Sequence, residues 1–384
     1  HRVGFEMGEQ EDSVLCEMPE HYIMELVLSW LPMESVHNFC SVSKEMNDML
    51  NSSRFVSLWA THSNKNPFLV LCTKQPLKHC NVAYSFSTHT WFKFPKPPNT
   101  LTVYYRGSAA GLVLLEMSSN NVGIHETGLC VCNPLTRTLL KLPPIRKPTV
   151  EMAWIVGGKD RESYKVVAWE NDQMIQIYDS CTRSWSDGDE LPCQVFDMNL
   201  HRDMVASKGI IFFMKGHRRG VYCIKEEAPL EVSLVQLPEA VQDEKRSWCR
   251  MVSCGSRTIL AGSPVGKIRN GPYVLKDVVI WELGDDYSWK NIASMPRDLL
   301  DDFRPCSFRC DCVGVGDNVC FVNQTLNQMV VEVVVCNVRD GRWEWICSYR
   351  RPHELNAWPE PKPDWIGEIV AFEARPDIKL PDAY

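Results

Sequence analysis

Residues 131–143 read VCNPLTRTLLKLP, which is an apolar strand, a polar turn, a second strand and a closing leucine and proline. The same pattern occurs six times along the chain. The copies are Ala83 to Pro95, Val131 to Pro143, Ile177 to Pro192, Val221 to Pro238, Val279 to Pro296 and Val334 to Pro352. Their closing prolines lie 48, 49, 46, 58 and 56 residues apart. A period of about 50 residues in strand-rich sequence is typical of a β-propeller, whose blades are four-stranded sheets. The repeats therefore predict a mainly β fold with six blades, and seven as the alternative.

The composition is that of an ordinary soluble protein. The chain has 384 residues, 45% of them apolar, enough to bury one large core and a small additional domain. Its net charge of −7 argues against general attraction to nucleic acid or anionic lipid. No stretch approaches the roughly 20 apolar residues of a membrane span, and the first residues lack the apolar centre of a signal peptide. We expect no membrane partner and a location in the nucleus or cytoplasm. Because the chain begins with His1 and not Met, we expect native residues to precede it.

The 17 cysteines lie mainly in apolar strands and are not spaced as a disulfide framework, so we expect most to be reduced core residues. The densest group is Cys306, Cys310, Cys312 and Cys320, which suggests a zinc site. However, Cys310 and Cys312 alternate with Asp311 in a strand-like run, and the sequence contains no CxxC pair. The sequence therefore predicts no metal and no cofactor.

A different pattern precedes the repeats. Residues 18–60 carry apolar side chains at helical spacing, as in Ile23, Leu26, Val27, Trp30 and Leu31. Pro32 is expected to end the first helix and Ser35 to cap the next, which gives two or three short helices. So small a unit buries little surface alone, and its exposed apolar face is expected to need a partner.

The residues of this helical segment resemble an F-box. The matching positions are Met18-Pro19 at the opening, Trp30-Leu31-Pro32 in the middle, Val42-Ser43-Lys44 at the signature and Phe55 near the end. Two positions depart from the family, because Ser43 stands in place of Cys and Met46 in place of Trp. Methionine is a flexible apolar residue, so packing at this position is expected to survive with less precision. These two departures bear on how tightly the segment binds an adaptor, and not on its resemblance to an F-box.

F-box helices followed by kelch-like strands are the layout of F-box/kelch-repeat proteins, common in plants, and the resemblance covers nearly the whole chain. We expect a flexible acidic N-terminus over 1–15, F-box helices over 16–62 and a kelch-type propeller over 63–384. The resemblance implies docking on a Skp-type adaptor and through it a cullin, with the propeller recruiting a protein for ubiquitination. Catalysis belongs to other subunits. The residues carried over to adaptor contact are Pro19, Leu26, Leu31, Pro32, Val36, Val42, Ser43, Lys44 and Met46. About half of them are expected to hold the helices together instead.

Hairpins are expected within the blades. Small or turn residues separate apolar runs in residues 108–116, 204–215, 251–262 and 312–324. The closing segment, residues 365–373, is expected to pair with residues 67–71 and complete the first blade. The ring would then close without free edges.

Arginines lie just before the first strand of several of these hairpins. Because equivalent positions in different blades fall on one ring, their guanidinium groups are expected at the propeller mouth, where they suit carboxylate or phosphate. Nearby aromatic rings are expected to act as anchors. The predicted partner-binding residues are Arg106, Trp154, Arg202, Trp248, Arg250, Phe308 and Arg309. The predicted ligand is an acidic or phosphorylated segment of a protein. The alternative is that such arginines are solvated or form ion pairs between blades.

Enzyme functions are disfavoured. The sequence contains no GxSxG, HExxH or phosphate-loop motif and no glycine-rich dinucleotide fingerprint. A copper oxidase on a similar propeller would need converging Tyr, Cys and His side chains, which the sequence does not place. The stronger alternative is an F-box protein acting as a non-degradative transcriptional cofactor that binds a DNA-binding protein through the propeller. DNA itself is expected to be contacted indirectly, or through basic loops at 216–220 and 265–271.

Overall fold

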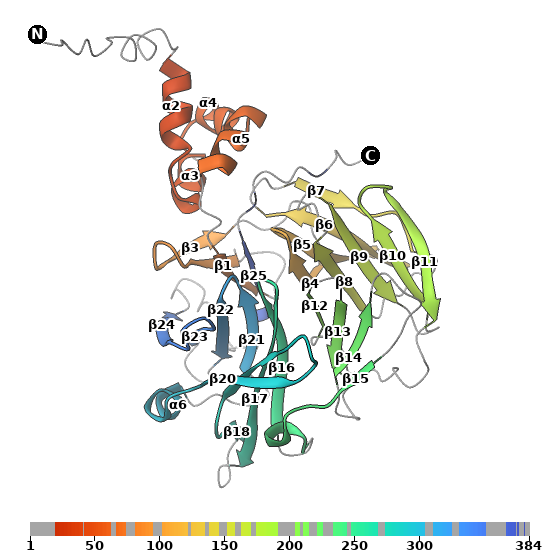
Figure 1. Cartoon of the computed structure of the whole chain (residues 1–384). Coiled ribbons are helices and arrows are strands. Elements are labelled where there is room, and N and C mark those ends of the chain that lie inside the picture. Colours follow the sequence, from red (N-terminus) through yellow and green to blue (C-terminus); the bar gives the residue numbers. More distant parts are fainter. Residues whose placement is uncertain are drawn as a thin grey trace, which may run out of the picture.

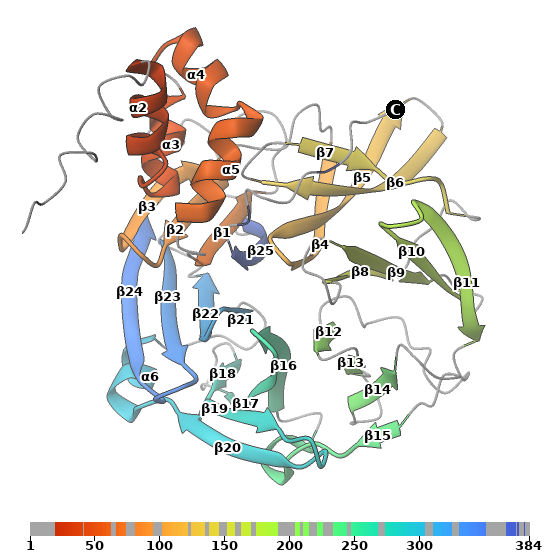
Figure 2. The same cartoon turned by 45° about the horizontal axis from the view of Figure 1, so that its top comes forward.

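The fold is given by a computed structural model and consists of a small helical unit and a ring of six sheets (Figures 1 and 2). The structure describes residues 20–384 except 41, 63–66, 74–80, 95–101, 122–123, 135–137, 146–151, 158–162, 170–173, 191–203, 208–209, 215–220, 226–232, 244–246, 268–272, 304–309, 325–329, 351–365, 374, 376–379 and 381–384. No helix in this described part is long and apolar enough to cross a bilayer. The predicted N-terminal segment 1–15 lies outside the described residues.

The helical unit contains four short helices within the described residues. They are α2 (Glu20–Leu28), α3 (Met33–Phe39), α4 (Lys44–Leu50) and α5 (Ser53–His62). Pro32 occupies the N-cap position of α3, so the prediction that Ser35 caps this helix is wrong. The fixed φ of proline suits a helix start, and the helix begins directly after it. The side chain of Ser43 caps α4 by accepting a hydrogen bond of 3.1 Å from the backbone N–H of Met46.

Helix α5 holds the unit together. Phe55 and Trp59 are buried, and Trp59 Nε1 donates to the carbonyl oxygen of Leu31 at 3.1 Å. Arg54 pairs with Glu25 on α2, with 3.1 Å between Nε and Oε2. These contacts tie α2, the turn after it and α5 into one small core.

Each sheet is one blade of a propeller, and the blades follow one another in chain order around the ring (Figure 2). From the inside outward, the strands of the first three blades are β25 (Ile366–Glu373), β1 (Pro67–Thr73), β2 (Asn81–Ser85) and β3 (Thr90–Phe94); β4 (Thr102–Ala109), β5 (Leu112–Asn121), β6 (Ile124–Asn133) and β7 (Thr138–Lys141); β8 (Met152–Gly157), β9 (Tyr164–Trp169), β10 (Met174–Asp179) and β11 (Ser184–Glu190).

The other three blades contain β12 (Met204–Ser207), β13 (Ile210–Met214), β14 (Val221–Lys225) and β15 (Ser233–Val235); β16 (Ser247–Cys254), β17 (Arg257–Lys267), β19 (Val279–Leu283) and β20 (Trp289–Ser294); β21 (Cys310–Val315), β22 (Asn318–Gln324), β23 (Val330–Asn337) and β24 (Trp343–Arg350). A short strand, β18 (Tyr273–Leu275), pairs with the end of β17. Two short helices, η2 (Glu239–Val241) and α6 (Arg297–Phe303), precede β16 and β21.

The six sequence repeats coincide with the third and fourth strands of the six blades, as in β6 and β7 for residues 131–143. The expected hairpins are the first and second strands of their blades. The prediction of a mainly β, six-bladed propeller preceded by a small helical region is therefore confirmed.

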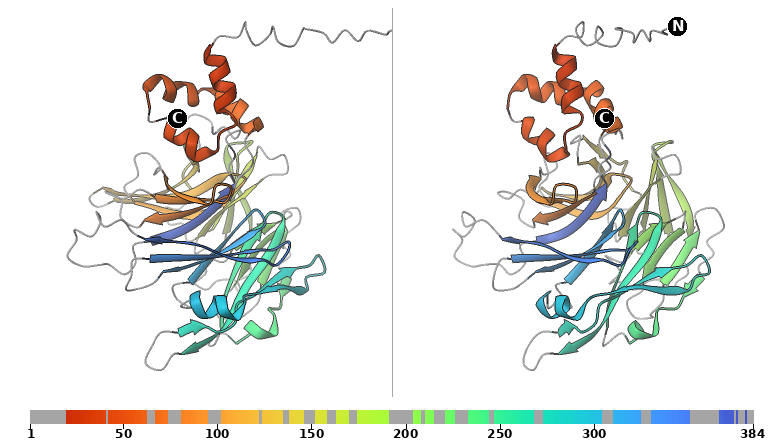
Figure 3. Two further views of the ribbon diagram at one scale, coloured as in Figure 1. Left: turned by 90° about the vertical axis from the view of Figure 1, so that its left-hand side faces the viewer. Right: turned by 60° about the vertical axis from the view of Figure 1, so that its left-hand side comes forward.

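The ring closes through β25, the innermost strand of the first blade. It pairs with β1 at seven positions, from Glu373 opposite Pro67 to Ile366 opposite Thr73. This pairing confirms the expected closure. Since α5 ends at His62 and β1 begins at Pro67, the helices join the propeller at the face where the inner strands end. Figure 3 shows the helices gathered at one end of the molecule.

Neighbouring blades share their cores, so many strands bury both faces. On β22, Phe321 packs into one apolar cluster, whereas Cys320 and Val322 pack into another. Double burial explains why the apolar and polar residues do not alternate cleanly in these strands. A further cluster contains Leu50 and Phe55 of the helical unit together with side chains of the first two blades, so the helices share a core with the propeller.

Burial makes several thiols unreactive, and we expect this to be measurable. Burial raises the pKa of Cys254 and Cys336 to about 12 and also raises the pKa of Cys320. Cys181 is exposed. Since the thiolate is the reactive form, iodoacetamide at pH 8 should label Cys181 roughly 100-fold faster than the three buried thiols. Peptide mapping by mass spectrometry gives the rates, and similar rates at all four positions would contradict the buried placement.

The suggested zinc ligands do not form a metal site in the described part of the chain. Cys310 and Cys312 belong to one apolar cluster and Cys320 to another, and Cys306 lies outside the described residues. No three His, Cys, Asp or Glu side chains among the described residues are placed to share a metal ion.

Candidate partner-binding sites

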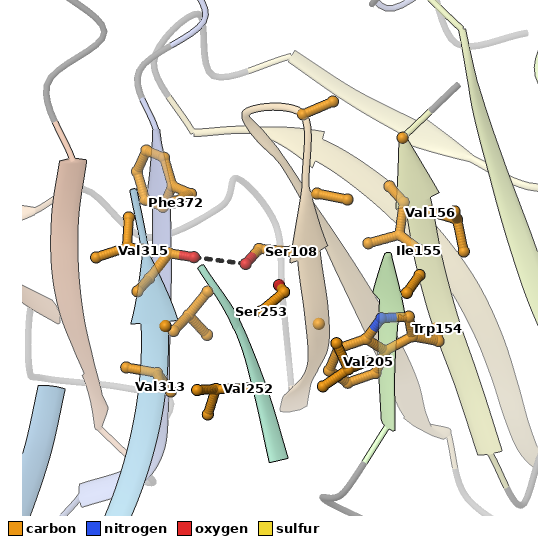
Figure 4. A pocket seen from close by; sticks show the side chains of 18 of the residues that line it. Ser108, Trp154, Ile155, Val156, Val205, Val252, Ser253, Val313, Val315 and Phe372 are labelled. Atoms are coloured by element: carbon orange, nitrogen blue, oxygen red, sulfur yellow. Dashed lines mark hydrogen bonds between the residues drawn. The ribbon is translucent and has the colours of Figure 1, made fainter. Parts of the chain in front are cut away.

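The six inner strands surround a channel of about 1230 Å³. On each inner strand, we take the first residue along the chain that lines the channel, and we call these six residues the mouth. They are Tyr105, Trp154, Met204, Met251, Asp311 and Ile369. The inner strands run from these residues toward the face that carries the helical unit, so the mouth residues are the lining residues nearest the opposite face. Figure 4 shows the wall from close by, with Val315 and Phe372 lying across the channel from Trp154.

Two of the predicted arginines are described, and both lie within inner strands rather than before them. Arg106 is in β4, lines the channel and pairs with Glu116 on β5. Arg250 is in β16 and pairs with Asp311 on the next inner strand, with 3.2 Å between Nε and Oδ1. Both arginines are thus held in fixed positions by carboxylates, and Arg106 faces the channel.

The predicted aromatic anchors occupy different places. Trp154 is half-buried in the channel wall. Trp248 is 5% exposed and packs against Phe321, and the Arg250 guanidinium carbon lies 5.8 Å from the centre of its ring. Trp248 therefore supports Arg250 from inside the blade. Arg202, Phe308 and Arg309 lie outside the described residues.

The other end of the channel carries polar groups that the sequence did not indicate. Lys165, Asp179, Glu373 and Arg375 line this end, together with Ser207. Ser207 and Glu373 end inner strands, Lys165 is near the start of β9, Asp179 ends β10 and Arg375 follows β25. These positions have no shared spacing in the sequence. Only the ring arrangement brings them together.

Most of the exposed large apolar side chains of the described residues belong to the helical unit. Eight large hydrophobic side chains are exposed in the described part of the chain, and five of them belong to this unit. We call these five the apolar patch: Met24, Leu26, Val27, Trp30 and Val42. Trp30 is 67% exposed and Val42 is 68% exposed. Trp30 stacks on His62, with 4.3 Å between ring centres, which holds the indole outward. Exposed apolar area concentrated in so small a unit marks an interaction surface.

The residues predicted to contact an adaptor fall into two groups. Leu26, Val42, Ser43 and Lys44 are exposed, whereas Val36 is buried and the others described are half-buried. Leu31, Val36 and Met46 pack in the cluster that joins the helices to the first blades. Pro19 lies outside the described residues. Met24, Val27 and Trp30 were not among the residues predicted to contact an adaptor, although the helical spacing of Val27 and Trp30 indicated an apolar face.

Comparisons with known proteins agree with the helical unit and the propeller. No protein-family model matches the chain. F-box only protein 6 of Arabidopsis thaliana is 23% identical over 385 residues, which cover 97% of this chain and 76% of that protein. Two F-box/kelch-repeat proteins of the same plant are 22% and 24% identical, covering 76% and 87% of this chain and 72% and 85% of their own lengths.

A chain of a nidogen/laminin complex aligns with a TM-score of 0.47 at 8% identity, covering 80% of this chain and 99% of that chain. A similarity of this size adds nothing to the fold described above.

The fold and the two sites thus define a six-bladed propeller with an N-terminal helical unit that exposes an apolar patch. Its homologues, at low identity, are plant F-box and F-box/kelch-repeat proteins. Their names suggest, in general terms, a non-catalytic F-box substrate-adaptor role.

Proposed function

We propose that the chain is the substrate-recognition subunit of a Skp–cullin–F-box ubiquitin ligase. The helical unit docks on a Skp-type adaptor, the adaptor recruits a cullin, and the propeller captures the protein to be ubiquitinated. The apolar patch is the observation that carries this proposal, because five of the eight exposed large hydrophobic side chains of the described residues lie there. The F-box names of the relatives support the same assignment.

The adaptor interface in this proposal is the apolar patch together with Ser43 and Lys44 at the start of α4. Burying a fully exposed large apolar side chain contributes about 1.5–3 kcal/mol, so a few such residues supply most of a stable interface. Leu31, Pro32, Val36 and Met46 support the patch from beneath.

Substrate capture takes place at the mouth, on the face opposite the helices. Arg106, Trp154 and Arg250 are the described members of the predicted set, and an acidic or phosphorylated segment of the substrate is the proposed ligand. A receptor that holds adaptor and substrate on opposite faces can bind both together. The chain itself is non-catalytic in this proposal and acts in the nucleus or cytoplasm.

The proposal is tested by co-expression with a Skp-type adaptor and size-exclusion chromatography. We expect a 1:1 complex that is lost on Trp30→Asp and on Val42→Asp, because a buried unpaired carboxylate would replace an apolar contact. The matched control is Tyr273→Asp, which changes an exposed aromatic residue on β18, at the opposite face. Leu31→Asp is less informative, since Leu31 packs in the shared core and its loss would disturb folding. A complex that survives both patch variants would contradict the proposal.

The transcriptional-cofactor alternative uses the same two surfaces and differs in the fate of the partner. Once a propeller partner is captured, its abundance with and without proteasome inhibition separates the two. Accumulation on inhibition supports the ligase, and unchanged abundance supports the cofactor.

A further inference from the structure

The channel wall near the mouth presents two hydrogen-bond donors that have no partner among the described residues. Arg106 donates from Nε, at 2.7 Å, and from Nη2 to the same oxygen of Glu116, Oε2. Its Nη1 donates to no described atom. Glu116 is 6% exposed, so the charge pair fixes the guanidinium while leaving Nη1 available.

The second donor is the indole N–H of Trp154 on the adjacent inner strand, β8. Trp154 Nε1 donates to no described atom, and the ring is half-buried in the wall. The ring lies flat enough against β4 that a Cβ on Gly107 would be 3.0 Å from Trp154 Cε3. Glycine at this position therefore makes room for the indole, one residue away from Arg106.

The backbone is also irregular at this point. The pairing of β4 with β5 shifts between Tyr105 and Gly107, so Arg106 is the extra residue of a β-bulge. A bulge re-aims a side chain and often stands beside a binding site. Tyr105 before the bulge is half-buried and accepts a hydrogen bond from Asn81 Nδ2 at 2.8 Å, and both Tyr105 and Arg106 line the channel.

The opposite and neighbouring walls carry apolar side chains beside polar ones such as Ser253 and Asp311. Val205, Val252, Val313 and Phe372 line the channel and are seen around it in Figure 4. Pockets for small organic molecules usually measure about 300–1000 Å³ and combine apolar walls with a few fixed polar groups. A channel of about 1230 Å³ can hold such a molecule.

We infer that the channel binds a small organic acid, whose carboxylate accepts hydrogen bonds from Arg106 Nη1 and Trp154 Nε1 and whose apolar body lies along the valine-lined wall. A folded protein surface cannot enter the channel, and the Arg106 side chain is 19% exposed. The ligand must therefore be slender. The inference rests on the proposed function in that it uses Arg106 and Trp154 of the same mouth and replaces the acidic protein segment there by a small acid. Adaptor binding is measured separately, so it can succeed or fail whatever the channel binds.

The test is isothermal titration of the full chain with 1-naphthoate and with its neutral isostere 1-naphthamide. We expect 1:1 binding of the carboxylate, with the amide weaker by roughly 10- to 100-fold, the range for hydrogen bonds to a charged group. A peptide with a free C-terminal carboxylate and the same peptide amidated form a second pair of probes. Tighter binding of the free peptide than of 1-naphthoate would assign the carboxylate to a chain end and overturn the small-molecule ligand.

Variants locate the site. Arg106→Met combined with Glu116→Gln removes both charges together and should weaken 1-naphthoate binding by roughly 10- to 100-fold. Trp154→Phe keeps an aromatic ring, removes the N–H and should cost roughly 2- to 10-fold. The controls are Arg257→Gln, which breaks another arginine–carboxylate pair outside the channel wall, and Trp289→Phe on an outer strand.

The inference is overturned by any of three results. These are no binding of 1-naphthoate up to about millimolar concentration, equal affinity for acid and amide, or unchanged affinity in both channel variants. Circular dichroism and melting of each variant confirm that it is folded. If the charge-pair variant does not fold, Trp154→Phe with its control still decides the question.

Discussion

A chain that ends at Asp364 is expected not to fold into a propeller. Such a chain lacks β25, which pairs with β1 at seven positions and closes the ring. Its removal leaves the inner edge of the first blade unpaired and uncovers the side chains packed against Val370 and Phe372. Losing several buried apolar side chains at about 1.5–3 kcal/mol each, together with the strand pairing, is comparable to the whole 5–15 kcal/mol stability of a typical domain.

This expectation is checked by size-exclusion chromatography, circular dichroism and thermal melting. The truncated chain should be aggregated or lack a cooperative transition. A chain that ends at Leu380 is the control, because Leu380 is buried against the second and third blades and is retained. A monomeric truncated chain with an unchanged melting temperature would show that β25 does not close the ring.

Gly314→Ala is expected to destabilise the protein by roughly 3 kcal/mol, at the upper end of the usual cost of overpacking. Gly314 lies in β21, where it passes close to the neighbouring inner strand β16. A Cβ at this position would be 2.1 Å from the carbonyl oxygen of Ser253, and backbone cannot move aside as a flexible side chain can. The two inner strands would have to separate at this point.

The measurement is urea unfolding followed by fluorescence. Gly128→Ala in β6 is the matched control, since its Cβ would meet only Lys141 Cε, at 3.6 Å. The control should lie within about 0.5 kcal/mol of the native chain. If both variants unfold at the same urea concentration, the close approach of β16 and β21 is not present in solution.

The architecture was largely predictable because each blade contains the same local signals. Apolar runs separated by turn residues identify hairpins, and the prolines that follow the fourth strands set the period. The closing strand was predictable because PFLVL, residues 67–71, needed a partner and residues 365–373 were apolar and late in the chain. The blade number and the closing strand could both be inferred from the order of apolar runs and turn residues along the chain.

The details of the sites depend on register and packing, which the sequence does not show. Arg106 reaches Glu116 because a bulge shifts β4 against β5, and no residue pattern announced that bulge. Trp248 and Trp154 look alike in sequence, yet one is buried in a blade and the other lines the channel. The helix α2 ends at Leu28, and Trp30 lies in the turn that follows it. The sequence spacing of Val27 and Trp30 suggested one helix through both residues, but Trp30 is outside the helix and exposed.

The central claim is that the apolar patch binds a Skp-type adaptor. The most direct measurement is the affinity of the purified full chain for the adaptor, by isothermal titration, for the native chain and for Trp30→Asp and Tyr273→Asp. The account predicts 1:1 binding that Trp30→Asp weakens by roughly 100-fold and Tyr273→Asp leaves unchanged, as expected for a residue at the centre of an interface. Absence of binding by the native chain, or equal binding by Trp30→Asp, would contradict it.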